Sequence, residues 1–267
     1  MSSTMATAEL SSPLERAVRA EGELKLIPYA MAGFPDFDRS LDIARRFATS
    51  GAAAIEIGIP FSDPLADGPV IQAAGQQALA GGMTTAKALR LAAAVAEGPA
   101  APVVLMTYLN PILAYRPDRF ARDAAQAGVA GVIIPDLPAD EAEPLVEQLR
   151  EHGLDTIFLV APTSDDRRIE TISRHSRGFV YCVTLTGTTG VRTDLPATLG
   201  DLLARIRRHT SLPLAAGFGI SRPEHLDVLR GRADAAVVGS ALMAEVLEGR
   251  DPQRLLSTLL AACRSEG

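Results

Sequence analysis

One acidic side chain lies inside a run of residues that is otherwise typical of a buried strand. Residues 53–59 are small or β-branched and apolar, with the exception of Glu56, which is the pattern of a strand covered on both faces. An unpaired carboxylate in such a position is costly and is driven toward its neutral form. Glu56 is therefore a candidate proton carrier near neutral pH. The alternative is a structural ion pair with a buried Lys or Arg.

The neighbours of Glu56 indicate space for a ligand. Strand alternation places three isoleucines on one face and leaves only Ala54 and Gly58 beside Glu56 on the other. After Pro60 ends the ladder, the next loop contributes two further acids, Asp63 and Asp67. For Asp63 alone, turn formation is the favoured interpretation.

Three later loops, which follow the last three predicted strands, carry glycine. They contain Thr-Gly at 189–190, Gly-Phe-Gly at 217–219 and Gly-Ser at 239–240. Glycine lets a backbone approach an anion closely, and residue 240 begins a predicted helix whose free N–H groups can bind one. We expect a phosphate group here, so that the substrate is a phosphate ester with Glu56 and Asp67 acting at its other end. Ordinary turns and helix caps are the alternative.

Eight strand-like runs alternate with helical ones, which predicts a single (β/α)8 TIM barrel. The predicted strands are 24–33, 53–59, 102–107, 129–134, 156–160, 179–183, 213–216 and 233–238. The predicted helices are one starting near Pro13, then 38–50, 70–80, 85–96, 117–127, 139–152, 164–175, 194–209, 222–229, 240–247 and 252–263. The first and last are additions to the barrel, and residues 1–12 are expected to form a flexible tail. A doubly wound open sheet is the alternative, but no Gly-x-Gly-x-x-Gly turn follows the first strand.

Bulk properties exclude several classes of protein. The 267 residues suit one barrel domain, and 47% hydrophobic and 22% charged residues are globular values. The net charge of −6, without a basic block, argues against nucleic acid or membrane as partners. Two cysteines and four scattered histidines show no metal-ligand spacing. No secretory signal or spanning segment is evident, so we expect a cytoplasmic protein.

The run from 55 to 69, Ile-Glu-Ile-Gly-Ile-Pro-Phe-Ser-Asp-Pro-Leu-Ala-Asp-Gly-Pro, resembles the signature of the tryptophan synthase α chain. The similarity continues at 33–35, 105–111, 135–138, 187–190 and 217–221. Members of that family are barrels that cleave indole-3-glycerol phosphate to indole and glyceraldehyde 3-phosphate. The resemblance implies a β-chain partner carrying pyridoxal phosphate, an α2β2 tetramer, and no cofactor in this chain.

The resemblance also assigns residues by position. Glu56 matches the family's acid–base glutamate, and Asp67 matches its second catalytic aspartate. The remaining matches are the substrate pocket (Tyr29, Tyr108, Tyr181, Phe218), the phosphate site (Thr189, Gly190, Gly219, Gly239, Ser240) and the loop facing the β chain (Pro60, Asp63). Residues 184–188 depart from the family's commoner sequence.

We expect Glu56 to deliver a proton to the indole ring and to remove one from the neighbouring hydroxyl, with Asp67 accepting the ring N–H. An imine-forming aldolase is disfavoured, because only Lys25 and Lys87 are present and neither follows a strand. The open alternatives are a stand-alone indole-releasing lyase, another phosphosugar isomerase or aldolase, and an inactive activator of a β chain.

Overall fold

The computed structural model describes residues 11–20, 22–98, 100–183, 199–217 and 219–264. Its strands are β1 (Lys25–Met31), β2 (Ile55–Gly58), β3 (Val103–Met106), β4 (Val129–Ile133), β5 (Asp155–Ile157), β6 (Leu159–Val160), β7 (Val180–Val183), β8 (Leu214–Gly217) and β9 (Ala235–Val238). Its helices are α1 (Pro13–Val18), α2 (Phe37–Ala48), α3 (Pro69–Ala80), α4 (Thr85–Ala96), α5 (Leu109–Tyr115), α6 (Pro117–Gln126), α7 (Glu143–Glu151), α8 (Asp166–His175), α9 (Leu199–Arg207), α10 (Glu224–Asp227), α11 (Ser240–Leu247) and α12 (Pro252–Arg264).

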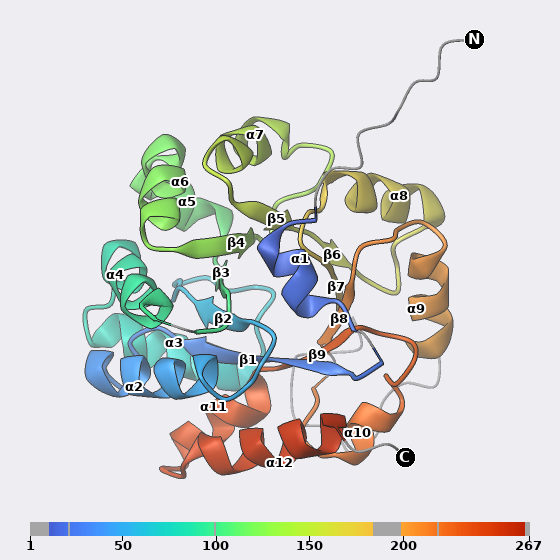
Figure 1. Cartoon of the computed structure of the whole chain (residues 1–267). Helices are drawn as coiled ribbons and strands as arrows, with labels where there is room; N and C mark the ends of the chain where they lie inside the picture. Colours follow the sequence, from blue (N-terminus) through green and yellow to red (C-terminus); the bar gives the residue numbers. More distant parts are fainter. Residues whose placement is uncertain (1–10, 21, 99, 184–198, 218, 265–267) are drawn as a thin grey trace.

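The strands form one parallel sheet in the order β5-β4-β3-β2-β1-β9-β8-β7-β6, with helices around the outside (Figure 1). The two ends of that order, β5 and β6, are separated in the chain only by Phe158. The sheet therefore curves into a barrel, which confirms the predicted fold. One predicted strand, 156–160, is divided at Phe158 into β5, which pairs with β4, and β6, which pairs with β7, so that the described residues form nine strands where eight were predicted.

Alternate residues of the strands face the barrel interior and the surrounding helices. Ala54, Ile27 and Val104 belong to the interior cluster, whereas Ile55 and Ile57 pack in the layer between sheet and helices. This is the alternation that the sequence predicts for residues 53–59, and it places Glu56 on the interior face.

Helix α1 lies across the end of the barrel where the strands begin (Figure 1). Leu14 and Val18 are fully buried in the interior cluster. Ser12 is the N-cap of α1: its hydroxyl accepts the Glu15 N–H at 3.0 Å and donates to Asp155. Ser12 thus belongs to the folded chain rather than to the expected tail, of which residues 1–10 lie outside the described part.

The last helix covers the barrel from outside, the role expected for 252–263. Leu256, Leu259 and Cys263 of α12 are buried, and the helix contacts β1, α2 and α11. No helix among the described residues is long and apolar enough to cross a membrane.

Proline explains the main differences between predicted and observed helices. The helix predicted over 139–152 begins only at Glu143, since Pro144 cannot supply an N–H and is tolerated only in the first turn. Conversely, α5 forms where the sequence analysis assigned no element, and Pro111 is tolerated because it lies in that helix's first turn. The helix predicted over 222–229 shortens to α10 after Pro223, and of 194–209 only 199–207 is helical within the described residues.

Candidate active site

Glu56 lies inside the barrel with no ion-pair partner among the described residues. Its side chain is 1% exposed, and Oε2 is buried without a hydrogen-bond partner. Burial, followed by the nearby charge of Asp67, raises the pKa of Glu56 to about 8. The structural alternative, a buried pair with Lys or Arg, is therefore not what the fold shows. At neutral pH the carboxyl holds a proton that it can give to a ligand.

Asp67 approaches the same space from the loop after β2. Burial raises the pKa of Asp67 to about 6, and a side-chain hydrogen bond from Tyr108 opposes that rise. The Tyr108 hydroxyl also accepts the N–H of Ala66 at 3.1 Å, which holds the loop against the residue that follows β3. Because Asp67 titrates below Glu56, the pair presents one ionised and one protonated carboxyl at neutral pH.

Tyr29 occupies the space beside Glu56 in which the sequence predicts room for a ligand. Tyr29 and Glu56 are register partners on β1 and β2, so their side chains point to the same face. A Cβ at Gly58 would lie 1.9 Å from the Tyr29 hydroxyl oxygen, so the small residue makes room for the tyrosine rather than for a ligand. Burial raises the pKa of Tyr29, with smaller contributions from Asp67 and Glu56.

Tyr181 repeats this geometry on the far side of the barrel. It is the register partner of Ala215, and its ring extends over Gly217, whose Cβ would lie 2.6 Å from the hydroxyl oxygen. Burial raises the pKa of Tyr181, followed by the charges of Glu56 and Asp67. Two predicted pocket tyrosines, Tyr29 and Tyr181, therefore lie in the electrostatic range of both carboxylates, and the third, Tyr108, lies in that of Asp67.

The described part of the predicted phosphate site lies after two adjacent strands. Gly219 follows β8 with φ 70°, and Gly239 is the N-cap of α11, of which Ser240 is the first residue. The first N–H groups of that helix have no acceptor within it. Gly239 also contacts Tyr29, because a Cβ there would lie 3.4 Å from the tyrosine Cβ. Thr189, Gly190 and Phe218 lie outside the described residues.

The loop after β2 exposes apolar surface that the sequence analysis did not single out. Pro60 is buried and Asp63 is exposed, with its carboxylate accepting the Ser62 hydroxyl at 2.5 Å. Leu65 is 95% exposed, and Leu113 on α5, which follows β3, is 52% exposed. The sequence does place Leu65 in a loop of Asp, Pro and Gly, where an apolar residue is unexpected. Whether its side chain is exposed, however, depends on the fold.

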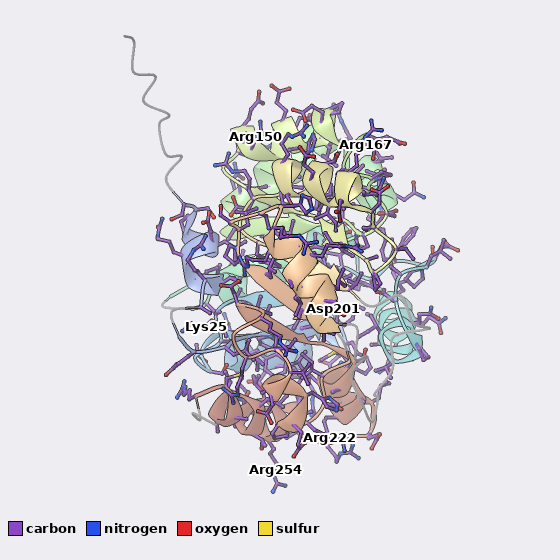
Figure 2. The ribbon with its side chains drawn as sticks, turned by 90° about the vertical axis from the view of Figure 1, so that its right-hand side faces the viewer. Lys25, Arg150, Arg167, Asp201, Arg222 and Arg254 are labelled. Atoms are coloured by element: carbon purple, nitrogen blue, oxygen red, sulfur yellow. The ribbon has the colours of Figure 1, made fainter. Side chains whose placement is uncertain are left out.

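Asp136, after β4, has a structural role. One carboxylate oxygen accepts the Leu109 N–H at 2.8 Å, so Asp136 satisfies a free donor in the first turn of α5. A pocket of about 540 Å³ lies at the opposite end of the barrel beside Leu24, Arg207 and Asp234. The first residue of β1, Lys25, also lies on the α1 side (Figure 2).

No group of three or more His, Cys, Asp or Glu side chains is arranged to hold a metal ion in the part of the chain that the structure describes. The side chains near Glu56 are instead a second carboxyl and phenol hydroxyls. Fold and site together define a TIM-barrel enzyme that carries out acid–base chemistry at the carboxyl ends of its strands.

Comparison with known proteins gives the family. Residues 16–266 match the family model described as tryptophan synthase alpha chain. The chain is 48% identical over 257 residues to the tryptophan synthase alpha chain of Gluconacetobacter diazotrophicus, with 94% of each chain covered. The corresponding protein of Carboxydothermus hydrogenoformans is 47% identical, covering 89% of this chain and 88% of the relative.

Solved structures agree with this family. Mycobacterium tuberculosis tryptophan synthase superposes with a TM-score of 0.88 at 36% identity, covering 96% of this chain and all of the other. A tryptophan synthase α-subunit from Pyrococcus furiosus gives 0.83 at 38% identity, covering 90% and 99%. The chain belongs to the tryptophan synthase alpha chain family, the lyases that perform the aldol cleavage of indole-3-glycerol phosphate.

Proposed function

We propose that Glu56 and Asp67 carry out the cleavage of indole-3-glycerol phosphate in this chain, with Glu56 as the proton carrier. The observation behind this proposal is the pair of unequal carboxyls: Glu56 is protonated up to about pH 8, whereas Asp67 is ionised above about pH 6. Two carboxyls whose environments separate their pKa values suit opposite roles.

The reaction begins with the protonated carboxyl of Glu56, which gives its proton to the ring carbon that bears the three-carbon chain. The ring becomes cationic, and Asp67 stabilises that charge by accepting a hydrogen bond from the ring N–H. The Glu56 carboxylate then removes the proton of the neighbouring hydroxyl. As the carbon–carbon bond breaks, its electron pair returns to the ring, the oxygen becomes an aldehyde, and Glu56 again holds a proton.

The phosphate end of the substrate is assigned to Gly219, Gly239 and Ser240, together with Thr189 and Gly190 from the predicted site. The free N–H groups at the start of α11 and the helix dipole favour a phosphate there. Tyr29 contacts Gly239 on one side and is the register partner of Glu56 on the other, so it lies between the phosphate end and the reacting end. Tyr108, Tyr181 and Phe218 are the other proposed pocket residues.

A β chain is the proposed partner, in an α2β2 assembly that receives the indole and holds the pyridoxal phosphate. The exposed leucines Leu65 and Leu113 support this, since both follow neighbouring strands at the end of the barrel that holds Glu56. Exposed apolar surface at one end of a molecule favours an interaction site there. We retain Pro60 and Asp63 as part of this surface, and the cytoplasm as the location.

Indole release from indole-3-glycerol phosphate tests the assignment of Glu56. We expect Glu56→Gln to abolish release while binding of the substrate persists, because the amide keeps the shape of the side chain but carries no transferable proton. Glu147→Gln is the matched control, since Glu147 is exposed on α7. Full activity of Glu56→Gln would refute the assignment. Release that needs no β chain would favour a stand-alone lyase, and no release by the wild type would favour an inactive activator.

A further inference from the structure

The hydroxyl of Tyr29 is a buried polar group whose role the mechanism above leaves open. Tyr29 is 5% exposed, and its hydroxyl lies 3.7 Å from the sulfur of Met31, to which it donates. A thioether is a weak acceptor. A buried hydroxyl with so poor a partner gains from a better one, because a buried polar group that is left unsatisfied is destabilising.

A second unsatisfied polar atom lies on the neighbouring strand. Oε2 of Glu56 is buried without a partner, and Tyr29 is the register partner of Glu56 on the interior face. Contact with Gly58 fixes the position of the phenol, since the hydroxyl oxygen lies 1.9 Å from where a Cβ would stand. A donor and an acceptor thus face the same space from adjacent strands, and one ligand oxygen can bond to both.

We propose that Tyr29 is a third catalytic residue, which donates a hydrogen bond to the substrate hydroxyl oxygen from which Glu56 removes its proton. The proton passes to the Glu56 carboxylate, the electron pair of the broken carbon–carbon bond passes to the ring, and the oxygen becomes the aldehyde oxygen. Tyr29 keeps its own proton throughout and stabilises the negative charge that develops on this oxygen. The raised pKa of Tyr29 is consistent with a phenol that remains a donor.

This inference rests on the proposed function, and Tyr29→Phe tests it because the ring that packs on Gly58 is retained. Steady-state indole release gives kcat and KM, and calorimetry gives Kd for indole-3-propanol phosphate, which has the indole and phosphate but lacks the hydroxyls of the three-carbon chain. We expect kcat to fall about 10- to 100-fold, less than for the loss of an oxyanion-hole donor, because this oxygen carries only a partial negative charge as its proton leaves. The Kd of the analogue is expected to stay at the wild-type value.

Tyr115→Phe is the matched control. Tyr115 also loses a hydroxyl bond, to Asp123 at 2.8 Å, but lies on α5 beside α6. We expect its kcat and Kd to equal those of the wild type. A wild-type kcat in Tyr29→Phe would overturn the inference. An analogue Kd weakened by as much as kcat/KM would also overturn it, because such a result would show that the Tyr29 hydroxyl contributes only to the packing of the site. Wild-type chain that releases no indole would contradict the proposed function itself and the inference with it.

Discussion

The hydroxyl oxygen of Tyr29 lies against the Cα of Gly58, so closely that a Cβ there would be 1.9 Å away. Position 58 is two residues after Glu56 on the same face of β2. The tyrosine from β1 therefore forms the wall of the site above Glu56. The same relationship joins Tyr181 to Gly217 on β7 and β8. In both pairs the glycine is required by a tyrosine on the adjacent strand.

Gly58→Ala is expected to displace the Tyr29 ring. Because the contact is with a packed side chain inside the barrel, we expect the free energy of unfolding to fall by about 1–3 kcal/mol, with a loss of indole release. Urea unfolding and an indole assay measure the two effects. In Gly58→Ala combined with Tyr29→Leu, stability should recover while activity does not, because the clash is gone and so is the hydroxyl.

Gly81→Ala is the control for this substitution. Gly81 has φ −74°, and the nearest atom to a Cβ would be 3.4 Å away, so alanine fits there. Equal stability of the wild type and Gly58→Ala would contradict the packing described for Tyr29.

The burial of Glu56 predicts a pH dependence of stability. The native pKa is about 8 and the ordinary value is 4.5, so between these the native chain holds a proton that the unfolded chain has lost. The free energy of unfolding therefore falls as pH rises through this window, by on the order of 5 kcal/mol in all. Glu56→Gln should remove this slope above about pH 6, where Asp67 is already ionised, and be more stable than the wild type above about pH 8.

Urea unfolding of both proteins across the window measures the effect. Glu147→Gln should retain the wild-type slope, because Glu147 is exposed. A Glu56→Gln protein whose stability changes with pH as steeply as the wild type would show that Glu56 is ionised in the native barrel.

The alternation around Glu56 was sufficient to place it in the barrel interior, because a strand allows only two faces. The occupant of the space beside it was not predictable from residues 53–59. Tyr29 comes from another strand, and only the parallel register of β1 and β2 brings its ring over Gly58. Local pattern gives the direction of a side chain, whereas tertiary pairing decides what fills the space next to it.

Helix ends show the same limit. No helix was predicted directly after β3, yet α5 forms there, and the Asp136 carboxylate, from the loop after the next strand, accepts its Leu109 N–H. The exposed state of Leu65 and Leu113 is likewise a property of the assembled barrel. Gly219, Gly239 and Ser240 lie after adjacent strands as predicted. That they bind phosphate, together with Thr189 and Gly190, stays a prediction.

The two carboxyl pKa values predict a bell-shaped pH dependence of kcat/KM for indole release. Activity requires Asp67 ionised, which fails below about pH 6, and Glu56 protonated, which fails above about pH 8. Because the carboxyls interact, the two limbs belong to the pair. Asp67→Asn should remove the acid limb and lower kcat about 100-fold or more, since the ring cation loses its counter-charge.

Asp42→Asn is the control for the acid limb, because Asp42 is exposed on α2 and should leave the profile unchanged. A profile that retains its acid limb in Asp67→Asn would assign that limb to another group.

Leu65 provides the sharpest test of the proposed β-chain surface. The Leu65 side chain is 95% exposed in this chain and can be buried only by a partner. Leu65→Ser should therefore weaken binding of a β chain. Full burial of a leucine contributes about 1.5–3 kcal/mol, which predicts a loss of affinity of about tenfold to a hundredfold in calorimetry. Leu247→Ser is the matched control, because Leu247 is also exposed, at 40%. It is the last residue of α11, whose first residue lies at the site end of the barrel, so Leu247 lies away from that end. Equal affinity of Leu65→Ser and the wild type for a β chain would show that the partner surface does not include this loop.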